Sequence, residues 1–278
     1  METVSFAGTV SFFCKIFYLH SIHKEKKPNF ADILNFFIMS WKESLDEKMN
    51  SLANTEFDYT ETSDIQKAAN IGLDNSGIYM EATVIYFEIK NIVYILKENG
   101  RRKAAQAYTM YSEVLSAIAA QTGGFLNSFS PNAFLVIYPG KDDSLMKAVT
   151  GALKISYALT ETYKHQFASI NGLEFAMGLD HGHIMGTKTI SDNGMETLSW
   201  FGTSIYKASR ICKECARPFY IGTSGIVYHN LGEGLKTTTR RILGIKKSVD
   251  MWTKVTYQYE NVKKHLYQTN HKISIEEE

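Results

Sequence analysis

Residues 123–140, GGFLNSFSPNAFLVIYPG, constrain the fold most strongly because they predict two short strands joined by a tight turn. Apolar residues recur over 125–129 and again over 134–138, and the residues between them, Ser130, Pro131 and Asn132, are typical of turns. A hairpin of this kind is a natural place to present a carboxylate to a metal ion. Here the tip carries the amide of Asn132, which brings no negative charge.

Predicted strands and helices alternate around this hairpin. The segment YMEATVIYFEI, residues 79–89, predicts a strand that is apolar on both faces, as expected of a central strand in a sheet. Residues 101–122 have helical spacing and end at Gly123-Gly124. Further helices are predicted at 144–167 and 203–215, and a further strand at 173–186. This order indicates a sandwich of helices and sheet, of the α+β or α/β class.

Three regions are expected along the chain. Residues 1–75 predict a helical extension and a polar linker, residues 76–260 the main domain, and residues 261–278 a C-terminal tail whose last residues, HKISIEEE, are expected to be frayed. The extension contains an apolar helical face formed by Phe30, Ile33, Leu34, Phe37, Ile38 and Trp41. Because a monomer should not expose that much apolar helix surface, this helix is expected near a homodimer interface.

Composition restricts the classes of partner. Lys and Arg number 30 and Asp and Glu 29 among 278 residues, so a net charge of +1 gives no overall field that favours nucleic acid or an anionic membrane. With 3 cysteines the chain is not a disulfide scaffold, and a reducing cytoplasm is expected. The apolar stretch VSFAGTVSFFCKIFYL is interrupted by Lys15 and is shorter than the roughly 20 residues that span a bilayer. A buried or partner-facing helix is expected for this stretch, with peripheral membrane attachment as the alternative.

Several segments, taken in order, resemble the catalytic domain of class III nucleotidyl cyclases, the adenylate and guanylate cyclases. They are VIYFEIKN, GGFLNSFSPNAFLVIYPG, GLDHGHIMG, WFGTSIYKASRI and RPFYIGTSGIVY, and they span roughly residues 82–257. The helix ahead of the domain, the NSG before the first strand and the last segment are most similar to bacterial pyrimidine cyclases of Pycsar antiphage systems. The resemblance implies an α+β sandwich whose central mixed, mainly antiparallel sheet is flanked by helices, with an N-terminal helical extension.

The resemblance also implies a metal site, and the sequence departs from it. In the family two carboxylates hold two Mg²⁺ or Mn²⁺ ions, which activate the ribose 3′ oxygen and clamp the leaving pyrophosphate. The first carboxylate position falls on Glu88, with the backbone of Ile89 beside it, and the second falls on Asn132. Glu88 keeps the charge but is one methylene longer than Asp, and Pro131 restricts the turn before the amide. Both metal positions are therefore expected to be degenerate.

Two further family positions lie on the helix predicted at 203–215. The ribose-orienting Asn falls on Tyr206, which is much larger, and the Arg that neutralises developing charge survives as Arg210. The segment where a transition-state lysine is usual reads Leu243-Gly244-Ile245, followed by Lys246 and Lys247. Arg210 therefore remains as a vestige of the catalytic set.

Nucleotide contacts are expected at two places. The turn and helix start at Lys90 and Asn91 correspond to backbone amides that face a triphosphate in the family. The base-recognition positions fall approximately on Ser128 and Ser199. Outside the resemblance, Cys212 and Cys215 are read as reduced thiols on a helix, and His181 and His183 as one packed and one exposed histidine.

Three functions remain open from the sequence. The preferred hypothesis is an inactive cyclase homology domain that acts through a head-to-tail homodimer, or through a partner cyclase-like chain, with an NTP as candidate ligand and no required metal. The second is an active cyclase that uses Mg²⁺ or Mn²⁺ and makes a cyclic nucleotide from UTP or CTP in antiphage signalling. The third is a purely structural interaction module. Loss of both metal aspartates favours the first.

Overall fold

The computed structural model describes residues 30–64, 71–72, 75–190, 194–242, 245–259 and 262–276. The chain divides into two compact units. The smaller unit contains Met1–Tyr59, Ile71–Gly77 and Thr187–Ser199, and the larger contains Thr60–Asn70, Ile78–Gly186 and Trp200–Glu278. The candidate site residues lie in the larger unit, with Ser199 as the exception.

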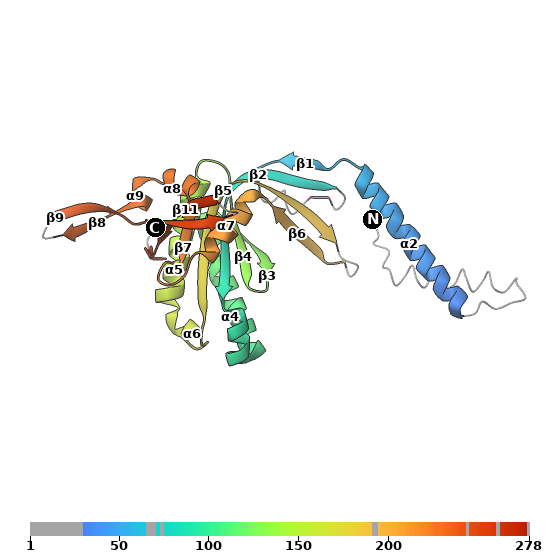
Figure 1. Ribbon diagram of the computed structural model, residues 1–278, viewed down its shortest axis with the longest axis horizontal. Helices are drawn as coiled ribbons and strands as arrows, with labels where there is room; N and C mark the ends of the chain where they lie inside the picture. Colours follow the sequence, from blue (N-terminus) through green and yellow to red (C-terminus); the bar gives the residue numbers. More distant parts are fainter. Residues whose placement is uncertain are drawn as a thin grey trace, which may run out of the picture. The chain divides into compact units, whose positions relative to one another are not determined.

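A mixed, mainly antiparallel sheet forms the centre of the larger unit (Figure 1). Its strands follow the order β10 (Thr253–Tyr259), β11 (Val262–Thr269), β7 (Ile221–Ser224), β5 (Glu174–Ile190), β2 (Ser76–Lys90), β4 (Ala133–Pro139) and β3 (Phe125–Ser130). Strands β5 and β7 are parallel, whereas β2–β4, β3–β4, β7–β11 and β10–β11 are antiparallel. Two more strands, β1 (Asp58–Glu61) and β6 (Glu196–Phe201), pair with β2 and β5.

Helices cover both faces of this sheet. One face packs against α4 (Ile92–Thr122), which is kinked at Gly100, and against α5 (Ser144–Tyr157). The π-helix η1 (Ala158–Thr162) and α6 (Lys164–Ala168) continue from α5. The other face packs against α7 (Thr203–Lys213). The predicted α+β sandwich with a mixed, mainly antiparallel sheet is therefore confirmed.

The two-residue period of β2 separates the core from the candidate site. Ile85, Phe87 and Ile89 are fully buried in the cluster that packs on α4 and α5. Side chains of alternate residues point to opposite faces of a strand, so Tyr86 and Glu88 face α7. Tyr86 packs on the small cluster under α7. The local sequence thus fixes which face of the sheet carries the acidic position.

Short elements complete the larger unit. The helices α8 (Gly225–His229) and α9 (Glu233–Lys236) precede β8 (Thr237–Ile242) and β9 (Ile245–Asp250), which form a separate two-stranded sheet. The expected tail at 261–278 requires correction, because Val262–Thr269 forms β11 between β10 and β7. The pattern KKHLYQT is polar at its start, but its second half is buried in the sheet.

The smaller unit contains α2 (Phe30–Asn54), which agrees with the predicted helical extension. The Asn75 amide donates a hydrogen bond of 2.8 Å to the Thr55 carbonyl and so ties the segment after the helix to its end. Trp41, Leu45 and Met49 recur every four residues along α2 and are exposed. No helix in the described ranges is both long and apolar enough to cross a membrane. The apolar segment around Lys15 lies outside the described residues.

The backbone of α7 approaches the sheet closely at Gly178 on β5. A Cβ atom added there would lie 2.0 Å from the Ala208 carbonyl oxygen and 2.5 Å from the Cys212 amide nitrogen. Both neighbours are backbone atoms of α7, so they cannot rotate away as a side chain could. The absence of a side chain at Gly178 therefore sets the position of α7.

We expect Gly178→Ala to lower the free energy of unfolding by at least about 1–3 kcal/mol, because the methyl group forces α7 off the sheet. Gly234→Ala is the matched control, since a Cβ atom at Gly234 meets nothing within 4 Å. Urea unfolding followed by circular dichroism measures both variants. Equal stability of the two variants would contradict this account of how α7 is seated.

Candidate functional site

The first strand and the hairpin bring the two predicted metal positions together. Glu88 pairs with Ala133 in the β2–β4 register, and Asn132 directly precedes Ala133 at the hairpin tip. The Ile89 amide donates a hydrogen bond of 2.7 Å to the Asn132 carbonyl. The convergence of Glu88 and Asn132 that the resemblance implies is therefore present in the backbone.

The Glu88 carboxylate is already paired with a cation from its own strand. The Lys90 ammonium lies 3.1 Å from Glu88 Oε2 and donates a second hydrogen bond of 3.1 Å to the Cys212 carbonyl in the last turn of α7. Both side chains are about one-fifth exposed. Burial, with a smaller contribution from Glu88, raises the pKa of Tyr86 to about 12. Glu88 thus sits in a half-buried position with a fixed counter-charge.

These residues do not fit a pair of magnesium or manganese ions. The Asn132 side-chain oxygen accepts a hydrogen bond of 3.0 Å from the Ser130 hydroxyl and carries no formal charge. Nowhere in the described residues do three or more His, Cys, Asp or Glu side chains gather in a way that could hold a metal ion. A two-metal centre needs several anionic oxygen ligands, and this location offers one carboxylate that is paired with Lys90.

The turn after Glu88 forms as predicted. Asn91 adopts the left-handed conformation, with φ of 57°, and α4 begins at Ile92. The Asn91 side-chain amide donates a hydrogen bond of 3.4 Å to Glu174. No side chain caps the helix start. The amides of the first turn of α4 therefore lack a side-chain acceptor, as an anion-binding helix start requires.

The other two predicted positions lie one turn apart on α7. Tyr206 is exposed, and Arg210 is half-buried. The Arg210 guanidinium lies 5.8 Å from the centre of the Tyr259 ring on β10, and its Nε atom is buried without a hydrogen-bond partner among the described residues. Lys264 on β11 lies 4.7 Å from the same ring. Arg210 and Lys264 thus flank Tyr259, which makes a cationic, aromatic surface.

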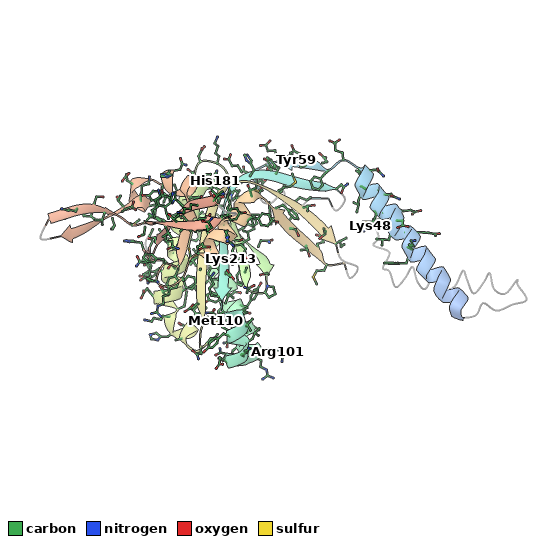
Figure 2. The ribbon with its side chains drawn as sticks, in the orientation of Figure 1. Lys48, Tyr59, Arg101, Met110, His181 and Lys213 are labelled. Atoms are coloured by element: carbon green, nitrogen blue, oxygen red, sulfur yellow. The ribbon has the colours of Figure 1, made fainter. Side chains whose placement is uncertain are left out.

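Sequence reasoning did not identify Tyr259 or Lys264 as site residues. They belong to the β10–β11 hairpin, which was assigned in part to a tail. Within α7, residues such as Ile205, Ala208, Ile211 and Cys212 face the sheet, whereas Tyr206 and Arg210 belong to the outer side. Within one chain, β2 and β4 bring Glu88 and Asn132 together, whereas Arg210 and Lys264 meet at Tyr259 on β10. Figure 2 labels Lys213 at the end of α7.

Comparison with known proteins identifies the fold of this chain. No family model matches the sequence. A uridylate cyclase from Xanthomonas perforans is 23% identical over 225 residues, which cover 79% of this chain and 92% of that protein. The crystal structure of the guanylyl cyclase Cya2 superimposes with a TM-score of 0.57 at 14% identity, covering 72% of this chain and 96% of Cya2. The chain has the class III nucleotidyl cyclase fold.

A third similar protein is a class III adenylyl cyclase-like ATP-binding protein from Pseudomonas aeruginosa. Its crystal structure has a TM-score of 0.55 and 14% identity, and the match covers 70% of this chain and 43% of that one. The resemblance to class III cyclases found in the sequence is therefore confirmed at the level of the fold. The match to a uridylate cyclase agrees with the similarity to pyrimidine cyclases.

The structure describes only some of the remaining predicted positions. Ser128 lies in β3, where its backbone pairs with Phe134, and its side chain is outside the described part of the structure. Ser199 is half-buried in β6, within the smaller unit. Leu243 and Gly244 fall outside the described residues, and Lys246 and Lys247 are exposed on β9.

The histidine interpretation is confirmed, whereas only Cys212 of the two cysteines lies on the predicted helix, because α7 ends at Lys213 and Cys215 follows it. Cys212 and Cys215 are free and buried, and burial raises the pKa of the Cys215 thiol to about 12, so both thiols are inert at neutral pH. His181 is packed between Thr83 and Glu81, with ring nitrogens 2.9 and 3.0 Å from their side-chain oxygens. His183 is exposed and stacks on Tyr79 at 5.1 Å.

A buried carboxyl on β5 was not predicted. Asp180 has no exposed surface and faces α7, where the Lys207 ammonium lies 3.9 Å from Oδ2. Burial raises the pKa of this carboxyl above its ordinary value, and the nearby Ser224, Lys207 and His181 offset only part of the rise. The charged form is therefore disfavoured in the folded protein relative to the unfolded chain.

This shift predicts a pH-dependent gain from Asp180→Asn. Because the folded-state pKa is raised, the stability associated with Asp180 is present below its unfolded pKa and is lost as the pH rises through the folded value. Asp180→Asn removes that loss, so its melting temperature should exceed that of the wild type at pH 8 and the difference should shrink toward pH 4. The exposed Asp142→Asn should show no such trend. A variant that is less stable than the wild type at pH 8 would contradict the assignment.

Proposed function

We propose that this chain is a cyclase-fold protein that binds a nucleoside triphosphate weakly, does not cyclise it, and acts as a dimer. The single observation that carries the proposal is the pairing of Glu88 with Lys90 beside the amide of Asn132. Without two carboxylates there is no two-metal clamp, and the groups of such a clamp act jointly, so catalysis should fall by many kcal/mol.

The chain retains groups that suit phosphate binding. Arg210 and Lys264 provide two cations beside Tyr259, and the buried Nε atom of Arg210 has no partner among the described residues. A guanidinium binds phosphate oxygens through paired hydrogen bonds, and an ammonium adds a point charge. The first turn of α4 adds backbone amides. Divalent cations would both activate the nucleophile and neutralise charge in an active cyclase. Arg210 and Lys264 could replace only the charge neutralisation.

The proposal includes a dimer because the two groups of site residues are held by different elements of one chain. Glu88 and Asn132 lie where β2 pairs with β4, and Arg210 and Lys264 lie beside Tyr259. In a head-to-tail pair, Arg210 of one copy would face the Glu88 region of the other, as the resemblance to class III cyclases implies. Phe201 is half exposed on β6 and is available for such contact, whereas Trp200 is buried against Phe125 and cannot contribute its ring. In a reducing cytoplasm Cys212 and Cys215 would not link the copies.

The nucleotide proposal is tested with purified protein, each of the four NTPs and Mn²⁺. We expect no cyclic nucleotide by chromatography, weak calorimetric binding, and about a tenfold loss of affinity for Arg210→Ala, the usual cost of one charge-assisted contact. Arg101→Ala, on an exposed part of α4 labelled in Figure 2, is the matched control.

Two outcomes would contradict this proposal. Metal-dependent formation of a cyclic nucleotide that Glu88→Ala abolishes would establish the second candidate, an active cyclase, which the similarity to a uridylate cyclase favours. An absence of heat with every NTP would leave a purely structural interaction module.

The dimer is tested by light scattering at tens of micromolar protein. We expect the mass of two chains, and a shift toward one chain when Trp41, Leu45 and Met49 are all changed to Ser, because their exposed apolar stripe suits a second helix. Changing the exposed Glu43 and Glu47 to Ser on the same helix is the control. A monomeric mass for the wild type would refute dimerisation.

A further inference from the structure

We infer that Lys90 is a built-in cation that excludes divalent metal from the Glu88 position, so that a phosphate ligand binds there without metal. This inference deepens the proposed function and rests on it for the identity of the ligand. The exclusion of metal itself rests only on the contacts of Lys90, Glu88, Cys212 and Asn132. It can therefore be tested without any nucleotide.

The Lys90 ammonium has the environment of a bound cation. It contacts a carboxylate oxygen of Glu88 and the carbonyl oxygen of Cys212, each at 3.1 Å. The Cys212 carbonyl lies in the last turn of α7, where the helix dipole favours positive charge. A carboxylate and a helix-end carbonyl are both oxygen donors of the kind that hard cations select. The ammonium thus takes up donors that a metal ion would need.

The fold holds this arrangement in place. Glu88 and Lys90 are two residues apart on β2, so both side chains point to the same face of the sheet. The Cys212 carbonyl is fixed because α7 is seated against Gly178, where its backbone approaches too closely for any side chain. The two charged side chains are about one-fifth exposed, so water screens them less than a surface pair. A freely moving surface lysine would have none of these restraints.

A divalent ion is expected to bind weakly at the Glu88 position. It would meet the positive charge of Lys90 beside the one available carboxylate, and Asn132 adds no charge to compensate. To bind, the ion would have to displace the ammonium from both Glu88 and Cys212. An ammonium has three donors and the contacts above use two, which leaves one N–H for a phosphate oxygen.

The test is a titration of Mn²⁺ into protein without nucleotide, followed by electron paramagnetic resonance of the free ion. Four proteins form a complete set: wild type, Lys90→Met, Asn132→Asp, and the double variant. Lys213→Met removes an exposed charge from the same end of α7 and controls for general electrostatics. Lys90→Arg preserves the charge. Thermal unfolding verifies that each variant folds, and Lys90→Gln replaces Lys90→Met if the latter does not.

We expect no saturable site in the wild type below about 1 mM, the weak end of the range for oxygen-ligand sites. Lys90→Met should tighten Mn²⁺ binding at least about tenfold, in the wild-type background and in the Asn132→Asp background alike, because it frees Glu88. Lys213→Met and Lys90→Arg should bind as the wild type does. A wild-type site in the micromolar range that Glu88→Gln removes, or equal Mn²⁺ affinity with and without Lys90 in both backgrounds, would overturn the inference.

The nucleotide-binding proposal can be refuted independently of the Mn²⁺ titration. If the titration behaves as expected and calorimetry detects no NTP, the metal-excluding role of Lys90 stands and the proposed function is wrong. If NTPs bind tightly only with Mn²⁺, both are wrong.

Discussion

The seating of α7 on the sheet at Gly178 is the constraint on which the rest of the candidate site depends. At Gly178 the α7 backbone approaches strand β5 so closely that no side chain fits between them. Its last turn then supplies the carbonyl that holds Lys90 against Glu88, and its middle covers the buried Asp180. The outer side of the same helix carries Arg210 toward Tyr259. The helix α7 thus contributes to an ion pair, covers a buried carboxyl and carries the guanidinium that lies over Tyr259.

The electrostatics of the site differ from those of a metal-dependent cyclase in the source of positive charge. A two-metal centre brings mobile divalent ions to fixed carboxylates. Here the cations are side chains of the protein itself: Lys90 on β2, Arg210 on α7 and Lys264 on β11. Fixed monovalent cations can hold a phosphate, but they cannot lower the pKa of a ribose hydroxyl as a metal does. The proposal of nucleotide binding without turnover rests on this difference.

Local sequence signals were sufficient for the central strand, for the helix that follows it and for the hairpin. The turn residues Ser130 to Asn132, the helix stop at Gly123 and the alternation in β2 all act over a few residues, and each appears in the structure. The resemblance predicted that Glu88 and Asn132 lie close together, and the β2–β4 register places them so. It could not reveal the Lys90 contact to Cys212, because 122 residues separate the partners and only the packing of α7 brings them together. The strand β11 was missed for a similar reason, since its polar start is stabilised by pairing with β10.

In the proposed arrangement, the Lys90 ammonium occupies the position of a metal ion in this class III cyclase fold. Anomalous diffraction at the manganese edge, from crystals grown with Mn²⁺ and a non-hydrolysable NTP analogue, tests it most directly. The account predicts the Lys90 ammonium in contact with Glu88 and the Cys212 carbonyl, with no anomalous peak beside either. A manganese ion bound to the Glu88 carboxylate, with Lys90 turned away, would contradict it.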